Sequence, residues 1–157
     1  MFLKFLVVFF VSMVPIIELR GAVPIGVGMG LPEWAVLLVA LFGNLLPVPF
    51  IFFFARKLLE WGANLKWKKA QKFCTWCLKK GEKGGEKLQK KAGNNIYLAL
   101  ALFVGIPIPG TGAWTGTLAA SMLNLDRQKT IVAVATGLVL AGTIMSVISL
   151  GLFKFLG

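Results

Sequence analysis

Residues 96–125 read IYLALALFVGIPIPGTGAWTGTLAASMLNL, a stretch without a single charged side chain. Its helix-breaking residues gather in the middle, at Pro107, Pro109, Gly110 and Gly112. Each arm is then about a dozen residues, or roughly 18 Å of helix, which is too short for a bilayer core of about 30 Å. Non-helical backbone is tolerated at that depth only inside protein or beside a wet cavity. The stretch therefore predicts a re-entrant helical hairpin.

The rest of the chain repeats this plan. Residues 5–32 are also apolar, apart from two charges, and are divided by Glu18, Arg20, Gly21 and Pro24. Residues 34–55 and 130–153 are uncharged and long enough for single spans. We expect an all-α integral membrane domain with two transmembrane helices and two re-entrant hairpins. Its parts are hairpin 1–32, span 33–55, basic segment 56–94, hairpin 95–125 and span 126–153.

The composition supports a membrane protein. The 157 residues are 57% hydrophobic and only 15% charged, and the mean hydropathy is +0.81. So short a chain cannot hide that much apolar surface from water. The chain has no histidine and two cysteines, and no residues have the spacing of a catalytic set or a metal site. We expect no enzyme activity, no cofactor and no bound metal.

The net charge of +11 is concentrated in one segment. Residues 56–91 hold twelve basic residues and three acidic ones, which the positive-inside rule places in the cytoplasm. The first hairpin then enters from outside and the second from inside, as in the inverted repeats of secondary transporters. Both termini would lie outside. The alternative is four ordinary kinked spans with both termini inside.

The basic segment also carries apolar residues, at Trp61, Leu65, Phe73 and Trp76. This pattern is typical of an amphipathic helix that lies on anionic lipid, and we expect no nucleic-acid partner. Cys74 and Cys77 form a lone CxxC, which is half a zinc site at most.

Glu18 and Arg20 are the strongest candidates for function, because ionisable residues inside a membrane are costly and commonly functional. Glu18 could carry a coupling proton, and Arg20 could hold a phosphate or carboxylate. Gly21 and Pro24 would shape the turn. The alternative is a structural ion pair that locks the hairpin tip.

The second hairpin supplies the other candidates. Its returning arm begins near Gly110, Thr111 and Gly112, and a helix N-terminus favours an anion. Pro107, Pro109 and Trp114 complete this candidate ligand site, and the alternative is a tight turn alone. Secondary candidates are Asn44, which lies beside Pro47 and Pro49 in the second apolar stretch, and Arg127.

Two motifs carry a family resemblance. ELRGAVPIG at residues 18–26 and PIPGTGAWTG at residues 107–116 resemble the small multidrug export protein family of prokaryotes. That family is distantly similar to the DedA and SNARE-associated (VTT) membrane proteins, which are associated with lipid scrambling and undecaprenyl phosphate recycling. The resemblance implies that Glu18 matches the hairpin acid and that Pro107, Pro109 and Gly110 match a Pro-x-Pro-Gly turn. DedA proteins usually have further arginines near the second hairpin, whereas here only Arg127 and Lys129 are candidates.

We therefore expect a small multi-pass transporter in the inner membrane of a prokaryote. Its substrate would be amphiphilic or anionic, with lipid phosphate as one candidate, and Glu18 would couple transport to a proton. The expected partners are membrane lipid, anionic lipid at the basic segment above all, and further copies of the chain. Two alternatives remain: an exporter of small cationic or drug-like solutes, and a membrane scaffold whose basic loop recruits a partner.

Overall fold

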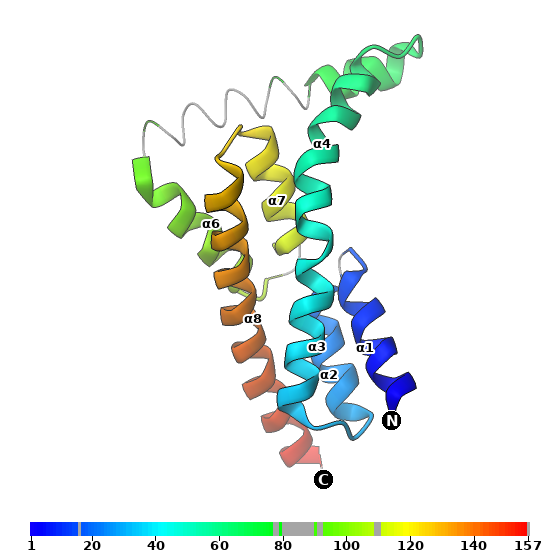
Figure 1. Cartoon of the computed structure of the whole chain (residues 1–157), viewed down its shortest axis with the longest axis vertical. Coiled ribbons are helices and arrows are strands. Elements are labelled where there is room, and N and C mark those ends of the chain that lie inside the picture. The colour runs from blue at the N-terminus through cyan, green and yellow to red at the C-terminus, as the bar shows by residue number, and fades with distance from the viewer. Residues whose placement is uncertain (16, 77–78, 80–89, 91–92, 109–110, 157) are drawn as a thin grey trace.

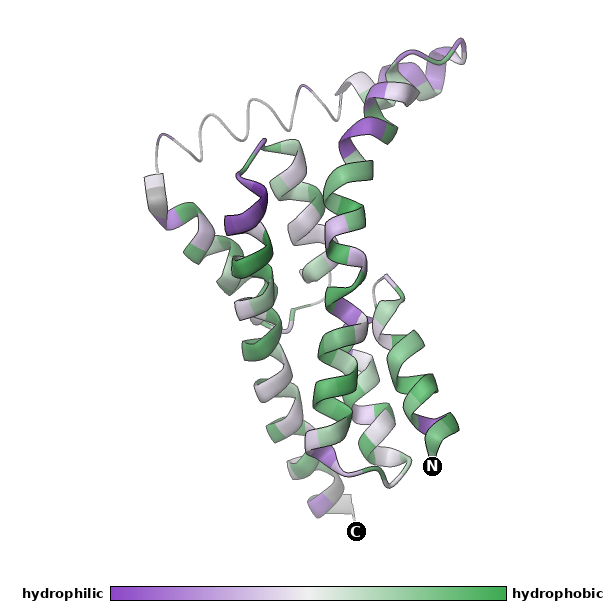
Figure 2. Cartoon of the chain, in the orientation of Figure 1, coloured by the Kyte–Doolittle hydropathy of each residue, from purple (hydrophilic) through white to green (hydrophobic). Residues whose placement is uncertain are grey.

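The computed structural model describes residues 1–15, 17–76, 79, 90, 93–108 and 111–156. These residues are helical apart from short connections, and they include no strand. Two pairs of short helices lie against two long helices (Figure 1). Both ends of the chain lie at one end of the molecule, and the basic end of helix α4 lies at the other (Figures 1 and 2).

The first pair consists of α1 (Phe2–Met13) and α2 (Glu18–Gly28). The chain turns back between them at residues 14–17, and Pro15 prevents the α1 helix from continuing. The expected break at residues 18–24 is therefore wrong in position. Pro24 lies inside α2, where it removes one backbone donor without ending the helix.

The second pair consists of α6 (Ile96–Gly105), which follows the short 3-10 turn η1 (Gly93–Asn95), and α7 (Ala113–Met122). Residues 106–108 and 111–112 are not helical, in the region where the proline and glycine pattern predicts a break. The four paired helices have between 10 and 12 residues each. This agrees with the expected arms of about a dozen residues.

The long helices match the two predicted spans. Helices α3 (Glu33–Leu45) and α4 (Pro47–Ala63) are joined by Leu46, whose dihedral angles are helical. Together they form one apolar helix of 31 residues. Helix α8 (Arg127–Leu156) contains the second candidate span, Arg127–Leu152. At 1.5 Å per residue both exceed a bilayer core of about 30 Å. The first span runs past its expected end at residue 55.

Each helix pair has its own core. Val8, Leu19, Val23 and Val36 are buried where α1 and α2 meet α3. A second core joins α4, α6, α7 and α8; its buried residues include Val48, Leu100, Val104, Ala120, Val134 and Leu138. Helix α2 also packs against α8, and α7 packs against α4. The second helix of each pair therefore packs against the long helix of the other half of the chain. This packing brings the breaks of the two pairs close together.

The basic segment is described in part. Residues 68–76 are helical, and Phe73 and Trp76 stack with their ring centroids 6.2 Å apart. Cys74 carries a free thiol, and its side chain lies over Gly62 near the end of α4. Cys77 lies outside the described residues, as do most positions between 77 and 92.

Candidate functional site

Glu18 lies at the start of helix α7, far from its own position in the sequence. Its Oε1 accepts a hydrogen bond from the backbone N–H of Trp114 at 3.0 Å, and its Oε2 accepts one from Ala113 at 3.3 Å. The side chain is almost fully buried, with 5% of its surface exposed. A helix N-terminus has unpaired N–H groups and partial positive charge. Glu18 therefore caps α7 with a carboxylate from another part of the chain.

The backbone at both partners is unusual. Glu18 has φ +50°, a conformation that side-chain-bearing residues seldom adopt. Gly112, the residue before α7, has φ +156°, and a Cβ atom there would collide with the Glu18 carboxylate. Strain of this kind is commonly concentrated at functional sites. The glycine at position 112 is thus required by the close approach of the carboxylate.

Arg20 binds the other side of the same break. Its Nη2 donates to the carbonyl oxygens of Val104 at 3.2 Å and Ile106 at 3.0 Å, and its Nη1 donates to that of Ile108. Its Nη2 also lies 2.9 Å from the Thr111 hydroxyl. The last carbonyls of a helix have no partner within the helix and carry partial negative charge. Arg20 therefore caps the end of α6.

Glu18 and Arg20 together hold both ends of the break at residues 106–112. We call these two side chains, together with the groups that they bind in the α6–α7 pair, the junction. Among the described residues the ion pair within 4.0 Å is Arg56 with Glu60, so Glu18 and Arg20 do not form the salt bridge that was one alternative. Each charge instead faces the helix terminus of opposite polarity. The junction is a cross-link between the two helix pairs.

Of the other predicted site residues, some lie at the junction, two lie outside the described residues, and four make no side-chain contact with the junction. Thr111 belongs to the junction, since its hydroxyl lies 3.0 Å and 2.9 Å from the carbonyl oxygens of Ile106 and Ile108. Pro107 lies within the break. Trp114 contributes its backbone N–H, and its buried indole Nε1 has no hydrogen-bond partner among the described residues. Pro109 and Gly110 lie outside the described residues.

Four candidates contribute no side-chain contact to the junction. Gly21 and Pro24 lie along α2, and the close neighbour of Gly21 is Ile17. Arg127 lies at the start of α8, 4.7 Å from the centre of the Phe53 ring. Asn44 is fully buried in α3, and in the described part of the chain neither atom of its amide has a partner.

Sequence reasoning missed the partners of the two charged side chains. The carbonyls of Val104, Ile106 and Ile108 and the N–H of Ala113 are backbone groups, so the residue types at these positions carry no signal. The proline and glycine cluster predicted where the break lies, but not which side chains bind its two ends. The described residues also include no group of three or more potential metal ligands.

The comparisons with known proteins identify a family. No curated protein and no solved structure matches the chain. A family profile described as "Putative small multi-drug export protein" matches residues 18–144, a range that begins at Glu18 and contains the junction and most of both long helices. With two helices that are long and apolar enough to cross a membrane, the chain belongs to this family of small membrane export proteins.

Proposed function

We propose that the chain is a transporter of an amphiphilic or anionic substrate, and that the junction is its gate. One observation carries this proposal. The N-terminus of α7, which is suited to an anion, is already occupied by the Glu18 carboxylate. An anionic group of the substrate would compete with Glu18 for the same two N–H groups. Substrate binding and opening of the junction would then be one event.

The gate requires two hairpins that enter the membrane from opposite sides. In Figure 1 the α1–α2 pair begins at the lower end and the α6–α7 pair at the upper end, and both turn back near mid-height. The helix contacts support such an inverted repeat. Helix α1 packs on α3 as α6 packs on α8, while α2 packs on α8 as α7 packs on α4.

Equivalent glycines support the same repeat. A Cβ atom on Gly43 of α3 would lie 2.6 Å from the carbonyl oxygen of Phe9 in α1. A Cβ atom on Gly137 of α8 would lie 2.5 Å from the carbonyl oxygen of Ala101 in α6. Small residues of this kind allow close helix packing in membranes. In each half, the long helix and the first arm of the pair thus touch backbone to backbone at one glycine.

The ends of α2 and α7 are also alike. Each is followed by a residue with positive φ, Gly30 at +75° and Asn124 at +53°. The next residue is a buried leucine whose N–H donates to the carbonyl five residues earlier, at 3.2 Å for Leu31 and 3.1 Å for Leu125. This is the hydrogen-bond pattern of a Schellman motif. Both long helices begin directly after it.

Glu18 and Arg20 would have different roles in transport. A proton on Glu18 would remove the charge that holds α7, so protonation and substrate binding would both favour the open junction. Arg20 holds α6 through several carbonyls and would act as the pivot. A bare cation is a poorer substrate, because the buried carboxylate already accepts two N–H groups and Arg20 lies close in sequence. The chain would work as a homo-oligomer, with the basic segment on cytoplasmic anionic lipid.

Reconstitution into vesicles tests this function. The probe is a phosphatidylglycerol with a fluorescent headgroup, whose transfer between leaflets is followed by chemical quenching from outside. We expect transfer by the unmodified protein and no change in Glu33→Gln. We expect strong loss in Glu18→Gln, which cannot regain the negative charge that closes the junction, and in Arg20→Lys. Efflux of a cationic dye is measured in the same vesicles. Dye efflux without lipid transfer would mean that the substrate is a cationic solute and not a lipid. If the folded protein showed neither activity, the result would favour the membrane scaffold.

Topology is tested separately. Reporters that are active only in the cytoplasm are fused to the C-terminus and inserted near Lys69. The inverted repeat requires a signal from the insertion near Lys69 and none from the C-terminus. Signals from both would mean four complete crossings and would overturn the hairpin arrangement.

A further inference from the structure

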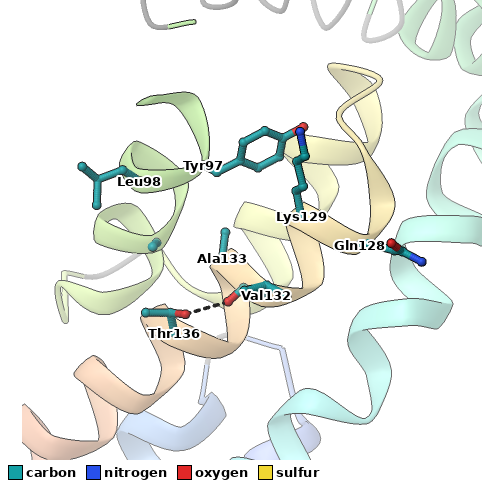
Figure 3. Close-up of a pocket in the computed structure, with 8 residues that line it drawn as sticks. Tyr97, Leu98, Gln128, Lys129, Val132, Ala133 and Thr136 are labelled. Carbon is teal, nitrogen blue, oxygen red and sulfur yellow. Dashed lines mark hydrogen bonds between the residues drawn. The ribbon is translucent and has the colours of Figure 1, made fainter. Parts of the chain in front are cut away.

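A second site lies outside the junction, in a groove between α6 and α8 (Figure 3). Its volume is about 580 Å³, within the range of roughly 300–1,000 Å³ that small-molecule sites occupy. Three lining residues come from α6 and five from α8: Tyr97, Leu98, Ala101, Gln128, Lys129, Val132, Ala133 and Thr136. Of these residues, only Lys129 was considered from the sequence, as a candidate counterpart of the arginines near the second hairpin of DedA proteins.

One end of the groove is cationic. The Lys129 ammonium lies 5.7 Å from the centre of the Tyr97 ring, and Figure 3 shows the two side chains side by side at this end. In the described part of the chain, no carboxylate oxygen lies within 4.0 Å of the Lys129 ammonium nitrogen. The Tyr97 hydroxyl accepts the N–H of Asp126 at 3.1 Å, which leaves its own proton free to donate. This end therefore offers a cation and a hydroxyl donor together.

The rest of the groove is apolar. Leu98 of α6 and Val132 of α8 both line the groove and are 61% and 64% exposed. Ala101 and Ala133, which also line it, are buried. At the far end, the Thr136 hydroxyl donates a hydrogen bond to the Val132 carbonyl at 2.8 Å (Figure 3), so its proton is already used. The groove is thus charged at one end and apolar along its length.

The charged end lies where a lipid headgroup would be. Hydrophilic residues gather at the start of α8 and on the upper part of α4, at the same end of the molecule (Figure 2). The apolar length of the groove runs from that end toward the middle of α8 (Figure 3). In a bilayer this orientation matches one lipid, with its headgroup at the interface and its chain in the core.

We propose that this groove binds one anionic phospholipid. The phosphate contacts the Lys129 ammonium and the Tyr97 hydroxyl, and an acyl chain lies along Leu98 and Val132. The site is separate from the junction and does not depend on the proposed transport activity.

Charge favours a lipid over a second copy of the chain. The sequence has 17 basic and six acidic residues. Of the acidic residues that the structure describes, Glu18 is buried in the junction, Glu60 is paired with Arg56, and Asp126 accepts the N–H of Lys129. Glu33 lies at the opposite end of the molecule, where α3 begins (Figure 1). A second copy of the chain therefore has few free carboxylates, among the described residues, that could pair with the Lys129 ammonium.

Lipid binding is measured by native mass spectrometry of detergent-solubilised protein, with phosphatidylglycerol and phosphatidylcholine as probes. Lys129→Gln should lower the preference for phosphatidylglycerol about fivefold relative to the unmodified protein, the factor that one lysine near a headgroup supplies. The basic segment is the same in both proteins, so its contribution cancels in this comparison. Val132→Trp should fill the groove and reduce the binding of both lipids. Lys154→Gln, at the other end of α8, should leave both unchanged.

Three results would overturn the proposal. One is an unchanged preference in Lys129→Gln. Another is unchanged lipid binding in Val132→Trp with a melting temperature like that of the unmodified protein. The third is a dimer that Val132→Trp dissociates, which would assign the groove to a second copy. The failure of this site would leave the vesicle assay unaffected, because that assay uses substitutions in the junction.

Discussion

The two breaks of the molecule are maintained in different ways. The first, at residues 14–17, is short and bound by its own chain, since Val14 donates to Val11 and Glu18 donates to Val14 through the backbone. The second, at residues 106–112, is longer; it has local hydrogen bonds from Ile108 and Thr111, and both of its ends are also held by Glu18 and Arg20 from the other helix pair. A break closed locally is a fixed turn. A break closed from outside opens when its partner leaves, so movement is expected at the second one.

The largest effect is expected from loss of Arg20. Arg20→Leu removes the charged donor of the Val104, Ile106 and Ile108 carbonyls, and hydrogen bonds to charged groups contribute about 1.5–3 kcal/mol each in favourable cases. We expect a loss of about 3 kcal/mol in unfolding free energy, measured by denaturant titration in mixed micelles. Arg56→Leu removes an exposed pair and should cost less than about 1 kcal/mol. Equal losses in the two variants would mean that Arg20 does not hold the junction.

The two equivalent glycines come next. Gly43→Ala and Gly137→Ala each force apart two backbones in contact, and overpacking of this kind costs about 1–3 kcal/mol. Similar losses in the same titration would show that the halves are built alike. Gly151→Ala, in α8, has open space around its Cβ position and should be neutral or slightly stabilising. A loss at only one of the paired glycines would argue against the repeat.

A smaller effect is expected as coupling between Gly112 and Glu18. Gly112→Ala alone places a methyl group against the carboxylate, whereas Glu18→Ala removes that obstacle. The double variant should therefore lose less stability than the sum of the single variants, by about 1 kcal/mol. Thermal unfolding of all four proteins measures this coupling. Additive losses would mean that the two residues are not in contact.

The smallest effect is expected in the first break. Pro15 is exposed and lies in a turn bound by its own neighbours. Pro15→Ala should change the unfolding free energy by no more than about 0.5 kcal/mol, and vesicle transport should remain. If Pro15→Ala abolished transport while the protein stayed folded, the first break would be the moving one.

Much of the fold was predictable from the chain. The uncharged runs at residues 34–55 and 130–153 predicted the long helices, because their length and hydropathy leave few other folds. The cluster from Pro107 to Gly112 located the second break correctly. The first break was misplaced because Pro24 was treated as a break, whereas the helix around it accommodates the missing donor.

The sequence by itself determined the class of the molecule and drew attention to Glu18 and Arg20, since buried charges in an apolar run are costly. Only the tertiary structure decided what they bind. Their partners are backbone N–H and carbonyl groups of α6 and α7, about ninety residues away, and every residue carries such groups. Which of them remain unpaired depends on where helices end and which ends meet, and that is decided by packing.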